Sequence, residues 1–171
     1  VPAETSALLR RRAELLSAAG EALHAAEAWA EYLAAVPDDL GALEARATLA
    51  AAGGGPRAAQ PWDRRLVQLA GDTLPPATRL TVWTRLGQAA VESSAWRDAI
   101  DAFEAAFALD AEGPRGREAL SMLAEAYARA RDQGGQYRTA LRLAARAEGD
   151  EDEALYRRAL ALAEAPRDGV D

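Results

Sequence analysis

Small residues recur along this chain at regular intervals. One set, with spacings of 34, 40 and 37 residues, is Ala13, Ala47, Gly87 and Ala124. A second set follows the first by 12 to 16 residues and is Ala25, Ala59, Ala99 and Ala140. Self-similarity at such a period is typical of repeat architectures, in which each unit packs on its neighbour. We expect these small side chains where two helices cross closely.

The composition between these positions favours helices. The chain has 45 Ala and 22 Leu but only six Val, one Ile and seven Thr, and Ala and Leu are strong helix formers. Apolar residues recur at spacings of three and four, which indicates one buried stripe per helix. Helix-breaking or capping residues interrupt this pattern at Gly20, Pro37–Asp39, Gly53–Pro56, Gly71–Pro76, Ser93–Ser94, Glu112–Pro114, Gly134–Gly135 and Gly149–Asp150. The sequence therefore predicts nine helices, each of about 12–17 residues.

Large side chains lie between the small ones and are expected to fill the gaps at the helix crossings. They are Trp29, Trp83, Trp96, Phe103, Tyr127 and Tyr137. A helical stripe of aromatic residues is normally packing rather than a ligand platform. We therefore predict that Trp29, Trp83, Trp96 and Phe103 belong to the core.

Residues 83–110 resemble a tetratricopeptide repeat (TPR), a pair of antiparallel helices. The residues on the family's motif are Trp83, Leu86, Gly87, Trp96, Ala99, Phe103 and Ala106. Ala90 departs from the usual Tyr, and Ala111 replaces the usual closing Pro. Less complete matches recur on either side, so the predicted repeats span about 6–39, 40–73, 80–113 and 117–149.

The resemblance implies an all-α fold, a TPR-like α-solenoid with about four helix pairs in a right-handed superhelix plus a C-terminal helix near 151–165. It covers nearly all of residues 1–171, which we interpret as a single domain. The chain begins in mid-pattern at Val1, so we expect it to be excised from a longer protein. Abundant Ala, Arg and Gly without Lys or Asn indicate a GC-rich, bacterial genome.

In this family the first helix of each pair lines a concave groove that binds a peptide or a partner helix. The matching positions here are Arg10, Arg11, Glu14, Ser17, Glu44, Ala45, Thr48, Ala52, Thr84, Arg85, Gln88, Glu92, Ser121, Met122, Glu125, Arg129, Tyr156 and Arg157. The family's carboxylate clamp of Lys and Asn is not expected, because the chain has neither residue. Arg11, Arg85 and Arg129 recur at nearly the same groove position, which suggests an acidic or mixed-charge peptide. The alternative is that these arginines are solvated and balance nearby Glu.

The sequence gives no sign of catalytic chemistry. There is no Cys, and the single His24 lacks a partner at metal-ligand spacing, so we expect it at the surface. The Gly53–Gly55 run lacks the Lys and Ser/Thr of a phosphate-binding loop and is expected to be a loop. Consecutive acids at Asp150–Glu153 suit a helix start rather than a calcium loop. Arg10–Arg12 is expected to be a solvated face, with Glu14 pairing Arg10. We predict no enzyme activity, no cofactor and no metal.

The charge argues against two classes of partner. The net charge is −7 with a pI of about 4.9, whereas a nucleic-acid binder normally needs a basic face. Residues 1–85 carry a net charge of −1 and residues 86–171 a net charge of −6. No apolar run reaches the roughly 18 residues that a membrane span requires. Nucleic acid and membrane insertion are therefore not expected.

The function that the resemblance implies is a non-catalytic protein–protein interaction module, a scaffold or adaptor with a peptide or partner helix in its groove. Bacterial signalling, polarity, secretion and pilus assembly are the contexts that we consider. One alternative is a regulatory or sensor domain of a larger enzyme or transcription regulator. Another is self-association, in which the last helix pairs with a second copy. A cytoplasmic location is expected.

Overall fold

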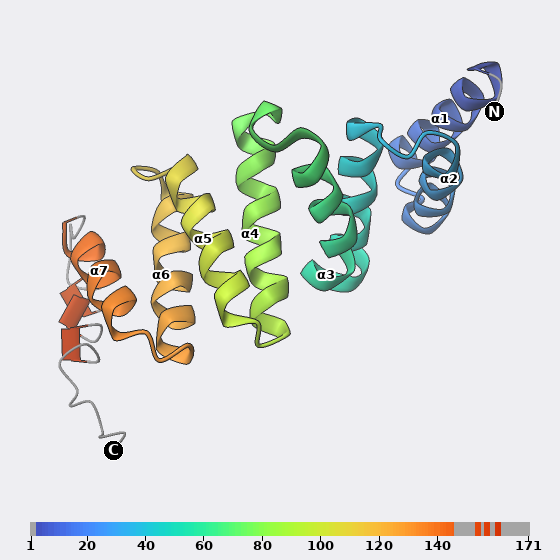
Figure 1. The fold of residues 1–171 in the computed structure, drawn as a ribbon. Helices are drawn as coiled ribbons and strands as arrows, with labels where there is room; N and C mark the ends of the chain where they lie inside the picture. Colours follow the sequence, from blue (N-terminus) through green and yellow to red (C-terminus); the bar gives the residue numbers. More distant parts are fainter. Residues whose placement is uncertain (1–2, 146–152, 155, 158–159, 162–171) are drawn as a thin grey trace. The chain divides into compact units, whose positions relative to one another are not determined.

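A computed structural model describes residues 3–145, 153–154, 156–157 and 160–161. The described residues contain helices and no strand. The elements are α1 (Ala3–Ala18), α2 (Ala22–Ala35), α3 (Leu40–Ala70), the short 3₁₀ helix η1 (Gly71–Thr73), α4 (Pro76–Glu92), α5 (Trp96–Leu109), α6 (Pro114–Arg129) and α7 (Gln133–Ala144). The predicted all-α fold is confirmed (Figure 1).

The long helix α3 is two helical segments joined at a kink. Gly55 has φ 74° and ψ −175°, which is not a helical conformation. A positive φ carries no steric cost for glycine because it has no Cβ. Pro56 follows at once, and Pro is tolerated at the first position of a new helix. The predicted break between two helices is therefore confirmed at Gly55, but the predicted loop over Gly53–Gly55 was wrong, because Gly53 and Gly54 are helical and a single residue makes the kink.

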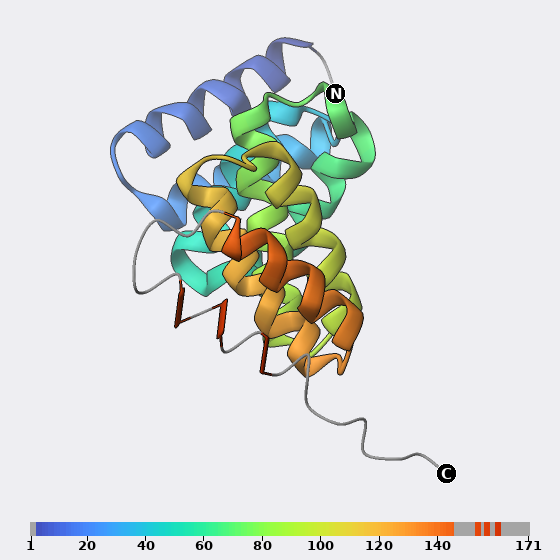
Figure 2. The same cartoon turned by 90° about the vertical axis from the view of Figure 1, so that its left-hand side faces the viewer.

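The chain divides into two compact units, residues 1–89 and 90–171, with the boundary inside α4. In the first unit α1 packs against α2, and α2 packs against α3. In the second unit α5 packs against α6, and α6 against α7, so that the three lie side by side (Figures 1 and 2). Contact between consecutive helices is the arrangement expected of stacked helix pairs. The interpretation of residues 1–171 as one domain stays a prediction.

Most helix ends fall where the sequence predicts them. Gly20, with φ 76°, follows α1, and Asp39 caps α3 by accepting a hydrogen bond from the Ala42 N–H at 3.0 Å. One predicted end was wrong, since Gly134 and Gly135 lie inside α7 rather than before it. The reason is Asp132, whose side chain accepts from the Gly135 N–H at 2.9 Å and starts the helix three residues earlier.

Gly135 has a packing role instead. A Cβ atom at this position would collide with the ring of Tyr127 on α6. Glycine therefore allows α7 to approach α6 closely enough to bury Tyr127.

The repeated small residues are in the core, as predicted, apart from one. Seven of the eight are buried, and Ala124 is half-buried. Trp29, Phe103 and Tyr127 are buried as expected. The other large side chains correct the prediction, because Trp83 and Trp96 are half-buried and Tyr137 is 48% exposed.

Helix geometry explains the exposure of Tyr137 and Trp96. In α7 the buried stripe consists of Gln136, Thr139, Ala140 and Leu143, and Tyr137 lies about 100° further around the helix. Trp83 shares its helical face with Leu80, Leu86 and Gly87, which are all buried, so the phase of the helix does not account for its partial exposure. Trp96 is the first residue of α5, where one side of the ring has no preceding helical turn.

Part of the predicted last helix is visible. Within 151–165, the helical residues are Glu153, Ala154, Tyr156, Arg157, Leu160 and Ala161, and the Arg157 guanidinium pairs with Glu153 one turn earlier. The rest of that predicted helix, with the acids at 150–152, lies outside the described residues.

Candidate functional site

A shallow hollow lies between α1 and the first segment of α3. Its volume is about 370 Å³, and its lining residues are Ser17, Gly41, Glu44, Ala45, Thr48 and Leu49. The α3 residues recur at spacings of three and four, so they share one face of that helix. Four of the predicted groove positions thus meet at one hollow in the first unit: Ser17, Glu44, Ala45 and Thr48.

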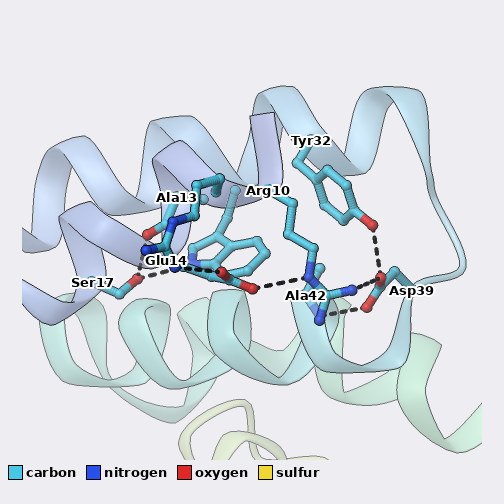
Figure 3. Close-up of polar contacts among 9 residues, drawn as sticks. Arg10, Ala13, Glu14, Ser17, Tyr32, Asp39 and Ala42 are labelled. Carbon is cyan, nitrogen blue, oxygen red and sulfur yellow. Dashed lines mark hydrogen bonds and ion pairs between the residues drawn. The ribbon is translucent and has the colours of Figure 1, made fainter. Parts of the chain in front are cut away.

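Ser17 is held in place by two hydrogen bonds. Its hydroxyl donates to the Ala13 carbonyl oxygen at 2.8 Å and accepts from the Trp29 indole N–H at 3.0 Å (Figure 3). The buried Trp29 of α2 therefore orients this wall of the hollow. Thr48 is fixed in a similar way, because its hydroxyl donates to the Glu44 carbonyl oxygen at 2.9 Å.

Arg10 joins α1 to the start of α3. Its Nε donates to Glu14 at 3.0 Å and its Nη1 donates to Asp39 at 3.0 Å. The Tyr32 hydroxyl donates to the same Asp39 oxygen at 2.7 Å (Figure 3). The predicted pairing of Arg10 with Glu14 is confirmed, but Arg10 is also a structural link between helices, which the sequence did not reveal.

These contacts change the pKa of both Asp39 and Tyr32. Burial alone would raise the pKa of Asp39, but the Ala42 N–H, the Tyr32 hydroxyl and the Arg10 guanidinium together lower it below its ordinary value. Burial raises the pKa of Tyr32, and its bond to the Asp39 carboxylate raises it further. Asp39 is therefore a charged cap that binds three groups from different parts of the chain.

The other arginines of the Arg10–Arg12 run also have partners. Arg11 is 69% exposed and lies 3.7 Å from Glu14, which is a loose contact. Arg12 donates to Glu31 of α2 at 2.7 Å. The expected solvated face is thus exposed, but it also carries two links from α1 to neighbouring elements.

Arg85 lies in a different environment from Arg11. Its Nε and Nη2 donate to the two Asp63 carboxylate oxygens at 2.9 and 2.5 Å. The Asp63 side chain is fully buried and that of Arg85 is 13% exposed. Burial raises the pKa of Asp63, against the opposite effect of Arg85. This pair joins the second segment of α3 to α4.

Asp63 was missed by sequence reasoning, although a signal existed. It lies four residues after Ala59 and three before Leu66, both buried, and so occupies the apolar stripe of its helix. A carboxylate in such a stripe requires a cation from another helix.

The remaining predicted groove residues are spread over α4, α6 and the last helical residues. On α4, the Thr84 hydroxyl donates to the Leu80 carbonyl oxygen, and Gln88 is half-buried. On α6, Met122 packs against the core of the second unit, while Glu125 lies 3.7 Å from the exposed Arg129. Tyr156 is half-buried.

Positions considered for catalysis or metal binding have ordinary surroundings. His24 is exposed, as predicted, and its Nδ1 lies 2.9 Å from Glu21. Within the described residues, no group of three or more His, Cys, Asp or Glu is placed to hold a metal ion. In the same part of the chain, no helix combines the length and the apolar character needed to cross a membrane.

Antiparallel helices in succession, with small residues buried where they cross, define a TPR-like helical repeat fold. Solved structures agree with this assignment. A MamA protein has a TM-score of 0.65 at 19% identity, with 93% of this chain and 88% of that chain covered. A putative kinesin light chain of Podosopora anserina, with nearly identical TPR-like repeats, has a TM-score of 0.52 at 18% identity, with 94% and 99% covered.

The sequence comparisons gave no match. No protein-family model matches the chain, and no curated protein does. The likeness to solved structures at this identity shows the fold alone.

Proposed function

We propose that this chain is a non-catalytic protein-interaction module that binds an extended peptide or a partner helix at the hollow between α1 and α3. The observation that supports the proposal is the meeting of Ser17, Glu44, Ala45 and Thr48 around one open depression. TPR-like folds are typically interaction scaffolds, and function in a repeat architecture normally lies on an extended surface.

The lining suits a partner's side chain. Gly41, Ala45 and Ser17 are short, so an incoming group can approach the α3 backbone. The walls are held by the hydrogen bond that Ser17 donates to Ala13, the one that it accepts from Trp29, and the Arg10–Asp39 link. A surface that is already ordered loses little conformational entropy when a partner binds.

The chain offers little for catalysis. It has no Cys, and its only His is exposed beside a Glu within one helical turn. A nucleophile with a base and an orienting group is the arrangement that covalent catalysis requires. These facts support a binding role rather than an enzymatic one.

A selection from a library of randomised displayed peptides tests the proposal. The wild-type chain is compared with Thr48→Trp, which fills the hollow from an exposed position. Thr5→Trp is the matched control, because Thr5 is also exposed on a helix and lies about 18 Å along α1 from Ser17. Circular dichroism checks that each variant is folded.

The expected result is a family of peptides that binds the wild type and Thr5→Trp but binds Thr48→Trp at least about tenfold more weakly, because the filled hollow excludes the peptide side chain. Equal binding to all three proteins would show that the peptides do not bind at the hollow. A selection that enriches no peptide would contradict the proposal.

The variants avoid Arg85 for a structural reason. Arg85→Glu would place a second carboxylate against the buried Asp63, so a charge swap there would test folding rather than binding.

A further inference from the structure

We propose that the hollow selects a peptide segment that presents a small apolar side chain next to a Lys or Arg, whose charge pairs with Glu44. This inference rests on the proposed function and specifies its ligand. The sequence suggests an acidic or mixed-charge peptide, whereas we infer a cationic one. The reason is that the hydrogen-bond donors around the hollow are already bonded and acceptors remain.

The polar groups that line the hollow are acceptors. The hydroxyl hydrogens of Ser17 and Thr48 are committed to the carbonyl oxygens of Ala13 and Glu44. What these hydroxyls can still offer a ligand is an oxygen lone pair. A carboxylate side chain entering the hollow would therefore meet oxygen atoms, whereas an ammonium or guanidinium group would meet acceptors.

Glu44 supplies the charge. Its side chain is exposed and accepts a hydrogen bond from the Thr78 hydroxyl of α4 at 3.0 Å. That bond positions one carboxylate oxygen but neutralises no charge. Among the residues that the structure describes, no ion pair is found for Glu44, whereas nearby Glu14 and Asp39 both pair with Arg10.

Arg10, the cation at the edge of the hollow, and Arg85, the predicted groove arginine of α4, are both already paired. The Arg10 Nη2 atom faces Gly41 at the edge of the hollow, but the guanidinium charge is already paired with two carboxylates, because Nε and Nη1 donate to Glu14 and Asp39. Arg85 is held by both oxygens of Asp63. The charge left for a ligand at the hollow is therefore the negative charge of Glu44.

The apolar part of the lining defines the neighbouring ligand residue. Gly41, Ala45 and Leu49 present hydrocarbon without a large side chain that reaches across the hollow. An aliphatic side chain that enters here buries its surface, while the adjacent cationic side chain extends its methylene groups and keeps its charged end near Glu44.

The test continues the peptide selection, with Glu44→Gln as the variant. Gln keeps the shape of Glu and can still accept from Thr78, but it removes the charge. Glu27→Gln is the matched control, since Glu27 is exposed on α2 and this substitution changes the net charge by the same amount. Affinities of selected peptides are measured by fluorescence anisotropy at low and high salt.

We expect Lys or Arg beside a small aliphatic residue in the selected peptides. We also expect binding about two- to fivefold weaker for Glu44→Gln at low salt, with a smaller difference at high salt because the pair is solvent-exposed. Glu27→Gln should bind like the wild type. Selected peptides rich in Asp or Glu, or equal binding to wild type and Glu44→Gln, would overturn the inference.

A charge reversal separates this inference from the proposed function. Glu44→Lys should bind a selected peptide better when the peptide's cationic residue is replaced by Glu. If peptides bind at the hollow but ignore the charge at position 44, only the ligand assignment fails. If no peptide is selected by the wild type, the proposed function fails with it.

Discussion

Each unit contains an ion pair in which an arginine makes two hydrogen bonds to a carboxylate of another helix, and the two pairs differ in burial. In the first unit Asp63 and Arg85 have side chains that are 0% and 13% exposed. In the second unit Glu104 of α5 and Arg142 of α7 have side chains that are 32% and 37% exposed. Both arginines make two hydrogen bonds to their carboxylate.

The partners of the two pairs differ as well. Within the part of the chain that the structure describes, Asp63 accepts side-chain hydrogen bonds from Arg85 alone, whereas Glu104 also accepts from the Tyr127 hydroxyl at 3.1 Å. The Arg142 guanidinium also lies 5.1 Å from the centre of the Phe107 ring. Removing the single partner of a buried charge lowers the free energy of unfolding strongly. Removing a partner of a half-exposed charge lowers it less, because the charge keeps its water and its other contacts.

The largest effect is expected for Arg85→Ala. It leaves the Asp63 carboxylate buried without a cation, which should lower the free energy of unfolding by about 3–5 kcal/mol. Urea unfolding followed by circular dichroism measures this loss. Hydrogen exchange resolved by segment should place it in α3 and α4. The control is Asp63→Leu combined with Arg85→Met, which removes both charges and should cost much less.

The loss for Arg85→Ala should depend on pH. Burial raises the pKa of Asp63 in the folded chain, so its contribution to stability is present below the unfolded pKa and is lost as pH rises through the folded value. Without Arg85 the folded pKa rises further. The difference between wild type and Arg85→Ala should therefore shrink as the pH is lowered, and a difference that grows in acid would contradict this assignment.

The next effect compares the two carboxylate caps. Asp39→Ala in the first unit loses the Ala42 cap and the bonds from Tyr32 and Arg10, so we expect a loss of about 2 kcal/mol. Asp132→Ala in the second unit loses the cap to the Gly135 N–H, for which we expect about 1 kcal/mol. Urea unfolding of both variants measures the difference. Equal losses would mean that Tyr32 and Arg10 add nothing.

The Asp39 effect has the opposite pH dependence to that of Asp63. The pKa of Asp39 is lowered in the folded chain, so its contribution is present above the unfolded pKa and is lost as pH falls through the folded value. The cost of Asp39→Ala should therefore be complete near neutral pH and smaller in strong acid. Asp39→Asn, which keeps a capping oxygen, should lose less stability than Asp39→Ala at neutral pH.

These contrasts show what the sequence could predict. The fold could be predicted from local signals. Helix breaks such as Gly20 and Gly55 interrupt the pattern within one or two turns, and small residues mark the helix crossings. The exposure of Tyr137 did not follow, since a shift of about 100° around a helix decides which side chain contacts a neighbouring helix. Glycine at position 135 predicts a helix break, whereas Asp132 starts the helix before it and the residue is Gly because Tyr127 of another helix packs against it.

The candidate site was predictable in part for the same reason. Glu44, Ala45 and Thr48 share a helical face that a repeat pattern can locate. The pairing of Arg85 with Asp63 spans 22 residues, and no local pattern shows that it removes Arg85 from ligand binding. Nor could the sequence show that the Ser17 and Thr48 hydroxyls donate to backbone carbonyl oxygens. These bonds leave the two hydroxyls as acceptors toward a ligand in the hollow.

The smallest effect is expected for Arg142→Ala in the second unit. It leaves Glu104 with the Tyr127 hydroxyl and access to water, so the loss in unfolding free energy should be about 1 kcal/mol or less. Part of that loss comes from the contact with the Phe107 ring, and Arg142→Lys should recover the charge but not the contact of a planar guanidinium with that ring. Urea unfolding beside Arg85→Ala gives the decisive comparison. If the two alanine variants lose the same stability, burial does not set the cost of breaking these pairs, and the shared partners of Glu104 do not protect it.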